Sequence, residues 1–260
     1  MPFVEWSTLS WTEAEALGRD ERTIGLIPLG ALEQHGPHLP LATDSLIIEP
    51  LAAAVADRIA GPVVVTPVVT GGLSEHHRGF PGTMTLDVPT FRATIVALLD
   101  AFERTGIRRA ALISSHGGNF AFLGDLVHDW ADVETMKVVA FSDLTAYLQA
   151  GFDAAGDLGI HPPRSDIHAG AIETGLAQHL FPELVRDGWQ DVTGLADSSP
   201  ELLGRVLTEG VHSVSPSGVL GDPALATPEL GGAVFERLRD DLAAWLVHEF
   251  DLAFVDAVDA

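Results

Sequence analysis

Cysteine is absent from the 260 residues, so the chain can form neither a disulfide framework nor a thiolate metal site. No apolar run reaches the roughly 18 residues that a membrane-spanning helix requires. The amino terminus carries acidic residues and no basic start, so we expect no secretory signal there. Together these absences favour a cytoplasmic enzyme of bacterial type with no membrane partner.

Basic residues are also scarce. Lysine and arginine total 14 against 37 aspartates and glutamates, which gives a net charge of −23. Such a surface repels phosphate backbones, so we expect no nucleic-acid partner. Most of the acids are expected to form a solvated shell. The 11 histidines are more informative, because several of them cluster with carboxylates.

The remaining composition favours a folded α/β enzyme, since 47% of the residues are hydrophobic and only 20% are charged. Apolar runs predict strands at 23–30, 62–69, 109–114 and 137–142. Helical periodicity predicts helices at 45–60, 89–104, 120–131, 144–151, 168–180, within 200–216 and at 227–250. This alternation predicts a mainly parallel sheet with helices on both faces, which we interpret as one domain over residues 1–260.

Ligands of such sheets bind beyond the carboxyl ends of the strands, and a first polar cluster follows the strand at 23–30. Glu33, His35 and Asp44 offer oxygen and nitrogen ligands that suit Zn²⁺ or Mn²⁺. In an extended segment, Glu33 and His35 point the same way. The alternative is a polar loop in which Asp44 only caps the next helix, for which Thr43 and Ser45 are also available as N-caps.

A second cluster follows the strand at 109–114. His116 stands at the strand end, and Gly117, Gly118 and Asn119 come before the next helix. The glycines allow the backbone to pass close to a metal or substrate, so we interpret His116 as a metal ligand and the other three residues as substrate contacts. The alternative is a simple chain reversal with an incidental histidine.

A third cluster contains His168 and Glu173. A glutamate flanked by alanine and isoleucine is an awkward core residue unless it is paired or bound to metal. The two residues would lie about 140° apart on an ideal helix, so both reach one site only if His168 lies at or before the helix start. We therefore assign Glu173 to metal and His168 to substrate or proton transfer, with a structural role as the alternative.

Residues 74–83 are rich in histidine, glycine and proline. This composition indicates a loop over the site, with His76 as a candidate substrate contact. A solvated loop without a function is the alternative interpretation.

The motifs EQHGPHLPLATD, FPGT, SSHGGN and HAGAIET resemble those of the creatininase (creatinine amidohydrolase) family over about residues 24–250. The resemblance implies a three-layer α/β/α domain, two divalent metal ions per chain and a homo-oligomer, usually a hexamer. It also implies that the metal ligands are Glu33, His35, Asp44 and His116, with Asp44 bridging the ions. Glu173 matches a glutamate in the later motif of the family.

The chain departs from creatininase proper in two places. Gly117 and Gly118 stand where creatininase has a tyrosine and a metal-binding glutamate, so the second metal needs another ligand, for which Glu173 is the candidate. The stretch 162–166 lacks the tryptophan that holds creatinine. With the segment 218–223, the HGGN version looks more like relatives that act on other amides. Those include formamide deformylases and the peptidase that trims the mycofactocin precursor.

The expected function is hydrolysis of a carbon–nitrogen bond in a small amide, cyclic amide or formamide. Two ions, Zn²⁺ and/or Mn²⁺ with Fe²⁺ as an alternative, would lower the pKa of water to near 7 and polarise the carbonyl. His168 would bring a proton to the leaving nitrogen, with Glu173 as the alternative donor. Three other functions remain open: a peptidase that trims a short peptide, a metal-dependent isomerase or lyase, and a non-catalytic scaffold.

Overall fold

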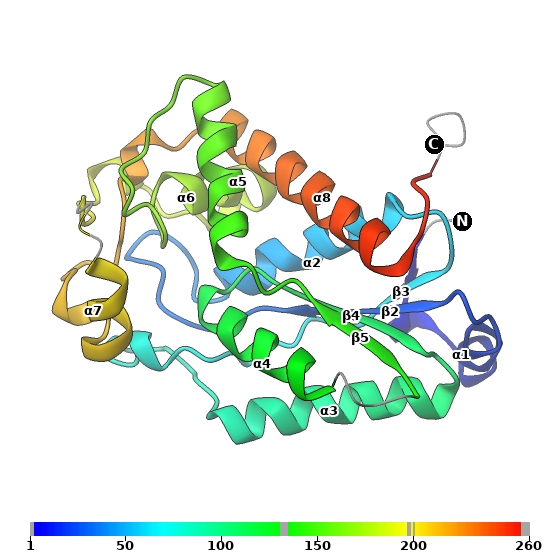
Figure 1. Cartoon of the computed structure of the whole chain (residues 1–260). Coiled ribbons are helices and arrows are strands. Elements are labelled where there is room, and N and C mark those ends of the chain that lie inside the picture. The colour runs from blue at the N-terminus through cyan, green and yellow to red at the C-terminus, as the bar shows by residue number, and fades with distance from the viewer. Residues whose placement is uncertain (1–2, 131–134, 197–198, 200, 256–260) are drawn as a thin grey trace.

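The fold is built on one parallel sheet, shown in a computed structural model that describes residues 3–130, 135–196, 199 and 201–255 (Figure 1). Its five strands lie in the order β1-β3-β2-β4-β5, and every neighbouring pair is parallel. In chain order they are β1 Val4–Glu5, β2 Ile24–Leu29, β3 Val63–Val65, β4 Arg109–Ser114 and β5 Lys137–Ala140. The expectation of an α/β fold with a mainly parallel sheet is confirmed.

Two strands are shorter than their apolar runs predicted. The run 62–69 forms a strand only over Val63–Val65, and Val69 then makes a single bridge to Leu29. Pro67 lies between them and has no N–H to donate to the ladder, which interrupts the pairing. The run 137–142 ends as β5 at Ala140. Strand β4 has the predicted bounds.

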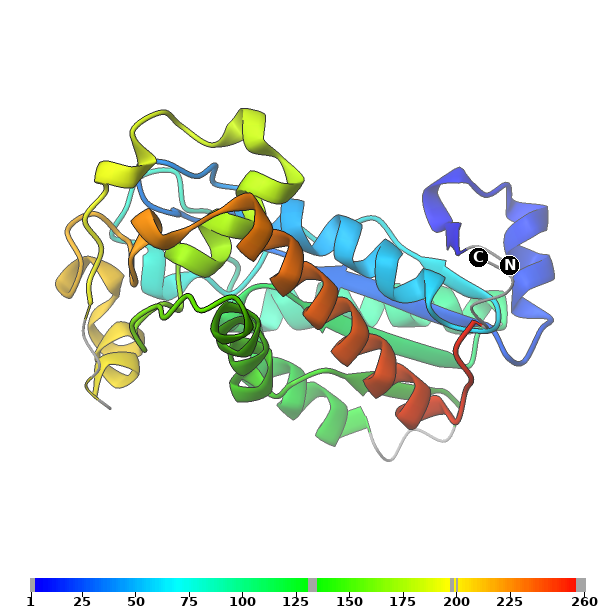
Figure 2. The ribbon, with the colours of Figure 1, turned by 90° about the horizontal axis from the view of Figure 1, so that it is seen from above.

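One face of the sheet is covered by α2 Thr43–Asp57 and α8 Pro228–Phe250, with α5 Leu144–Asp157 and α6 Ala171–Leu180 packed against α8 (Figures 1 and 2). The other face is covered by α3 Val88–Thr105 and α4 Phe120–Trp130. Strands β2 to β5 contribute side chains to the cores on both faces of the sheet, because successive side chains point to opposite faces. Two further helices, α1 Trp11–Gly18 and α7 Leu202–Glu209, lie at opposite ends of the molecule (Figure 1). The three-layer expectation is thereby confirmed.

The sheet has a switch point between its two central strands. From β2 the chain passes through α2 to β3 on one side, and it later returns through α3 to β4 on the other side. Leu29 pairs with Ser114, so β2 and β4 end at the same level. A crevice beyond such a pair of strand ends is where open α/β sheets bind ligands.

Helix starts differ from the prediction at two functional positions. α2 begins at Thr43 with Ala42 as its N-cap and no side-chain cap, so the proposal that Thr43, Asp44 or Ser45 caps it is wrong. α6 begins at Ala171 rather than at His168. Asp44 and His168, the polar residues near these two helix starts, instead contact other residues of the cluster described below.

None of the described helices is long and apolar enough to cross a membrane.

Asp166 holds the start of α6 in place. Its carboxylate is 2% exposed and accepts hydrogen bonds from the backbone N–H groups of Ala171 (2.9 Å), Ile172 (3.1 Å) and Asp222 (3.0 Å). Burial raises the pKa of Asp166 to about 6 against the lowering effect of these hydrogen bonds. At neutral pH the carboxylate is therefore ionised, and it caps the helix while it ties down the segment that contains Asp222.

We predict that Asp166→Ala lowers the free energy of unfolding by about 2–4 kcal/mol, because it removes a helix cap and leaves buried N–H groups without an acceptor. Urea denaturation followed by circular dichroism measures this loss. Asp87→Ala is the matched control, since Asp87 caps α3 from an exposed position. The control should lose about 1 kcal/mol. Equal losses in the two variants would show that the buried cap has no special role.

Candidate metal centre

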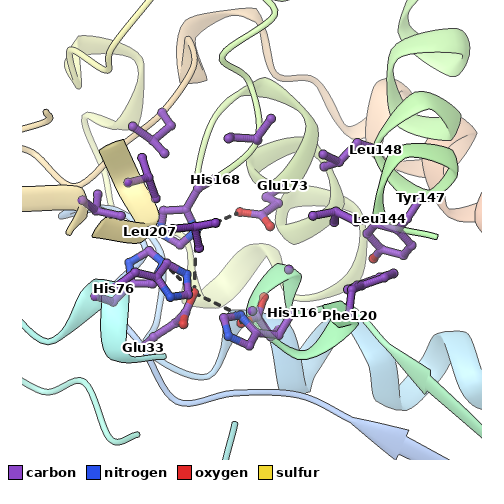
Figure 3. A pocket seen from close by; sticks show the side chains of 18 of the residues that line it. Glu33, His76, His116, Phe120, Leu144, Tyr147, Leu148, His168, Glu173 and Leu207 are labelled. Atoms are coloured by element: carbon purple, nitrogen blue, oxygen red, sulfur yellow. Dashed lines mark ion pairs between the residues drawn. The ribbon is translucent and has the colours of Figure 1, made fainter. Parts of the chain in front are cut away.

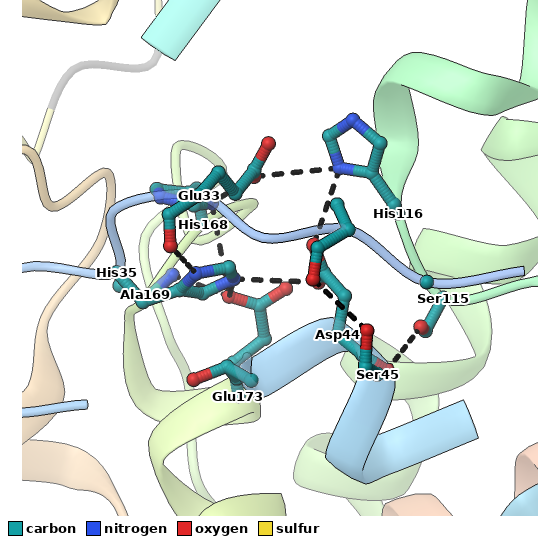
Figure 4. Close-up of polar contacts among 12 residues, drawn as sticks. Glu33, His35, Asp44, Ser45, Ser115, His116, His168, Ala169 and Glu173 are labelled. Carbon is teal, nitrogen blue, oxygen red and sulfur yellow. Dashed lines mark hydrogen bonds and ion pairs between the residues drawn. The ribbon is translucent and has the colours of Figure 1, made fainter. Parts of the chain in front are cut away.

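The predicted ligand residues come together beyond the carboxyl ends of β2 and β4 (Figure 4). Glu33 and His35 lie on the loop after β2, and Asp44 lies in the first turn of α2. His116 follows β4, and Glu173 lies in the first turn of α6. All are buried except Glu173, whose side chain is 19% exposed.

Asp44 lies between two imidazoles. Its Oδ1 is 3.3 Å from His35 Nε2, and its Oδ2 is 3.3 Å from His116 Nδ1. The helix start that carries Asp44 is held there by two serines: the Ser115 hydroxyl donates to the Asp44 carbonyl (2.7 Å), and the Ser45 hydroxyl donates to the Ala31 carbonyl (3.0 Å). Each carboxylate oxygen of Asp44 thus faces a different imidazole.

Two groups of ligand atoms share Asp44. On one side, His116 Nδ1 is also 3.3 Å from Glu33 Oε1. On the other side, His35 Nε2 is also 3.7 Å from Glu173 Oε2. The ligand atoms of Glu33, His35 and Asp44 lie within 4.8 Å of one another, as do those of His35, His168 and Glu173. These atoms could hold a divalent cation, and the Asp44 carboxylate is in contact with the imidazoles of both sides.

Backbone carbonyls orient both imidazoles. His35 Nδ1–H donates to the Glu33 carbonyl (3.1 Å), which leaves the Nε2 lone pair facing Asp44. His116 Nε2–H donates to the Leu73 carbonyl (3.1 Å), which leaves the Nδ1 lone pair facing Glu33 and Asp44. Such contacts set the tautomer and the ring orientation of metal-binding histidines.

Several of the facing atoms have no hydrogen-bond partner. Glu33 Oε2, His35 Nε2 and Asp44 Oδ2 are buried and unpaired within the part of the chain that the structure describes. Buried polar atoms are normally paired, and leaving one unpaired costs about 1–3 kcal/mol. Oxygen and imidazole nitrogen atoms that lack protons and converge on one point suit a divalent cation.

The electrostatics of the cluster also favour cations. Burial lowers the pKa of His35, but the carboxylates of Asp44, Glu173 and Glu33 raise it to about 10. Against the same effect of burial, Glu33 and Asp44 raise the pKa of His116 well above its usual value. Burial raises the pKa of Glu173 to about 7. The cluster thus draws positive charge, which divalent ions would supply without protonating the imidazoles.

His168 lies three residues before α6, which meets the condition that the sequence set for its reaching the same site as Glu173. Its Nε2–H donates to the Gln34 carbonyl (2.8 Å), so Nδ1 carries a lone pair. Nδ1 is 3.7 Å from Glu33 Oε1 and 3.9 Å from Glu173 Oε2. Burial and the charge of His35 lower the pKa of His168 to about 3, so the imidazole is neutral.

Two residues that the sequence did not single out support the site. The side-chain amide of Gln34 lies 2.8 Å from His77 Nδ1 and donates to the Gly218 carbonyl (3.0 Å). His77 Nε2 is 3.2 Å from Glu33 Oε1, so His77 donates a hydrogen bond to this carboxylate. Gln34 lies inside the first motif, and nothing else in the sequence indicated that it supports the site. Nothing in the sequence distinguished the buried His77 from its half-buried neighbour His76.

Of the four expected substrate contacts, three line the cavity and one does not. His76, Gly117 and Gly118 line the cavity described below. Asn119 does not, because it is fully buried: its amide donates to the Gly30 carbonyl and the Ser114 hydroxyl, and its Oδ1 accepts from the Leu73 N–H. The interpretation of Asn119 as a substrate contact is corrected to a link between the loops that carry the site.

Gly118 has no room for a side chain. A Cβ there would lie 2.3 Å from the Leu73 carbonyl oxygen and 2.5 Å from His116 Nε2. A glutamate at position 118 would therefore require a different local backbone. Glu173 reaches the cluster from α6, on the opposite side of the cavity floor from His116 (Figure 3).

A cavity of about 690 Å³ opens above the cluster (Figure 3). Glu33, Asp44, His116, His168 and Glu173 lie at its floor. Its walls are mostly apolar and come from α4, α5, α7 and nearby loops: Phe120, Leu144, Tyr147, Leu148, Ile167, Leu202, Val206, Leu207, Val211 and Leu220. Arg164, which is exposed, is the one arginine or lysine among the described lining residues.

Comparison with known proteins gives consistent matches. The family model "Creatininase: Creatinine amidohydrolase" matches residues 7–246. The mycofactocin precursor peptide peptidase of Mycobacterium ulcerans (strain Agy99) is 34% identical, over 85% of this chain and 84% of that protein. The creatinine amidohydrolase of Pseudomonas putida is 29% identical, over 93% of this chain and 95% of that protein. The solved structure "Creatininase Mn" has a TM-score of 0.73 and 27% identity, over 95% of this chain and 98% of that chain.

We predict that Asp44→Ala removes divalent metal, because both groups of ligand atoms share this carboxylate. The purified wild-type protein should hold about two divalent ions per chain after dialysis, and the variant close to none. Mass spectrometry of the dissolved metals gives the count. Glu49→Ala, an exposed change on the same helix, is the control and should keep the wild-type content. Full metal content in Asp44→Ala would defeat the shared-ligand assignment.

Proposed function

The chain belongs to the creatininase family, and from that premise we propose that it is a metal-dependent amidohydrolase that cleaves a carbon–nitrogen bond in an amide with a large apolar group. The observation that carries this proposal is the convergence of Glu33, Asp44, His116 and Glu173 at the floor of an apolar cavity, with His35 buried against Asp44 and Glu173. A scaffold protein has no use for buried, unpaired ligand atoms of this kind.

These five residues are the proposed metal ligands, with Asp44 shared between two ions. Zinc and manganese both suit the set of oxygen and imidazole ligands. Divalent ions bound there would supply Lewis acidity and form a nucleophile from water at neutral pH.

His168 is the proposed proton carrier. Its Nδ1 lone pair faces the carboxylates of Glu33 and Glu173 at the cavity floor, so it can accept a proton from the attacking water. As the bond from carbon to nitrogen breaks, the same proton passes from Nδ1 to the leaving nitrogen, which departs as a neutral amine. Gln34 holds the ring through Nε2 and keeps Nδ1 directed at the floor.

The cavity walls indicate the substrate. Creatinine is small and polar, whereas the side chains of Phe120, Leu144, Leu148 and Leu207 offer an apolar surface on two sides of the cavity (Figure 3). Each buried methylene of a substrate gains about 0.8 kcal/mol on such a surface. We therefore favour an apolar amide or a short peptide with an apolar residue at the scissile bond. The similarity to peptide peptidases supports the peptide form of this proposal.

The test is a substrate screen with the zinc- or manganese-loaded protein. Creatinine, formamide, acetamide, phenylacetamide and short peptides with internal leucine or phenylalanine are compared by mass spectrometry of the products. We expect acid and amine in equal amounts, with kcat/KM for the apolar substrates at least about tenfold above that for creatinine.

Asp44→Asn is the control for the screen, because it keeps the size of the side chain and removes the shared charge. It should lose activity by about a thousandfold or more. A preference for creatinine would overturn the substrate proposal. An isomer in place of acid and amine, or no cleavage of any amide by metal-loaded protein, would overturn the reaction class.

A further inference from the structure

The chain contains a single tyrosine, Tyr147, and this residue lies in the wall of the cavity. It stands on α5 one turn after Leu144 and packs against Phe120, with ring centroids 5.3 Å apart and an angle of 55° between the planes. Figure 3 shows both on the wall opposite His76 and Leu207. The ring is thus held in place by apolar neighbours.

The hydroxyl of Tyr147 is not committed to the protein. It makes no hydrogen bond with any residue in the described part of the chain, although the residue is half-buried. Half-buried tyrosines usually find a partner for this group. Burial raises the pKa of the phenol, and the charges of Glu173 and Asp44 raise it further, so the hydroxyl keeps its proton at neutral pH.

The loop after β4 leaves open space at Gly117, beside α5. Gly117 has no side chain, and the only atom within 4 Å of a Cβ built there is Leu144 Cδ1, at 3.8 Å. The cavity therefore continues from the cluster along Gly117 to the wall that carries Tyr147. A substrate that lies over the cluster has access to this hydroxyl.

Most other donors at the cavity floor are already used. His116 Nε2–H donates to the Leu73 carbonyl, and His168 Nε2–H donates to the Gln34 carbonyl. The Ser115 hydroxyl donates to the Asp44 carbonyl. His76 keeps free nitrogen atoms, but it stands on the opposite wall (Figure 3). On the α5 side, the described lining residues with a hydroxyl that makes no hydrogen bond to the protein are Tyr147 and the exposed Ser142, and of these only Tyr147 is held by packing against Phe120.

Resting on the amide hydrolysis proposed above, we propose that Tyr147 is a catalytic residue whose hydroxyl donates a hydrogen bond to the carbonyl oxygen of the scissile amide. As water adds to the carbonyl carbon, the π electron pair moves to this oxygen, and the phenol stabilises the charge while it keeps its own proton. When the carbon–nitrogen bond breaks, the pair returns and the carboxyl group forms. A donor of this kind stabilises the transition state more than the substrate.

We predict that Tyr147→Phe lowers kcat about 10- to 100-fold on the best substrate of the screen, with KM within about threefold and unchanged metal content. Tyr147→Leu is the matched comparison, since it removes the ring as well as the hydroxyl. It should show the same loss in kcat together with a higher KM. A purely apolar wall residue would give the opposite pattern, with Phe fully active and Leu impaired.

A second measurement does not depend on turnover. Because the chain has one tyrosine, growth with 3-fluorotyrosine places a single fluorine probe at position 147. Phenylacetohydroxamate is then titrated into the zinc-loaded protein, and the one ¹⁹F resonance should shift as the complex forms. Calorimetry should show about tenfold weaker binding of the hydroxamate to Tyr147→Phe than to the wild type.

The outcomes separate the two proposals. If no amide is cleaved but the ¹⁹F resonance shifts and Tyr147→Phe binds the hydroxamate more weakly, the contact stands and the proposed reaction fails. If amides are cleaved but Tyr147→Phe retains the wild-type kcat and hydroxamate affinity, the role of Tyr147 is overturned and the proposed reaction stands.

Discussion

The carboxylates of the buried Glu33 and Asp44 and of the partly buried Glu173 lie within reach of one another, and the structure of the whole site depends on this concentration of negative charge. Like charges in a poorly solvated interior repel strongly. The protein alone can compensate only by holding protons, which is why the pKa values of His35 and His116 are raised. Divalent cations remove the repulsion and leave the imidazoles neutral. Folding of this edge of the sheet and binding of metal are therefore coupled.

The sheet register brings these groups together. Leu29 pairs with Ser114, and Glu33 and His116 follow within a few residues of the two strand ends. A slip of one residue would turn the side chains of β2 to the other face, because their period along a strand is two. The continuously buried β2 resists such a slip, since apolar side chains on both of its faces fill a core. Packing far from the site thus determines the distances within it.

The sequence was informative where function and fold depend on local patterns. The apolar runs of β2 and β4 and the periodicity of α3 and α8 located these elements within one or two residues. The motif residues from Glu33 to His116 could be found because histidines and carboxylates directly follow buried strands, where open α/β sheets bind ligands. For His168 the sequence set only a condition: it must lie at or before the start of α6 to reach the same site as Glu173. Its outcome depends on Asp166, which caps the helix from outside its sequence.

What could not be predicted involves contacts between distant segments. The role of His77 arises because Gln34, 43 residues away, orients its ring. β1 has only two residues, which is too short for a strand pattern, and it pairs with β3. α1 was missed although Ser10 and Glu13 form a capping box at its start, which is a readable signal. The cavity walls come from Phe120, α5 and α7, which contribute apolar side chains that look like ordinary core residues in the sequence. Only their arrangement around the cluster shows that they face a cavity.

The absence of a side chain at Gly118 links the metal centre to the substrate wall. With no ligand available beside His116, the cluster is completed by Glu173 on α6, close to His168. The backbone that presents both residues is bound to Leu220 by the His168 bridge, and Leu220 also lines the cavity. The proposed metal ligand Glu173, the proposed proton carrier His168 and one cavity wall therefore belong to one packed unit. α5 and α7 pack against the same unit, α5 through Gly151 beside Ile172 and α7 through Leu202 and Val206 in one buried cluster with Leu220. The substrate wall and the candidate metal ligands are therefore held by the same packing.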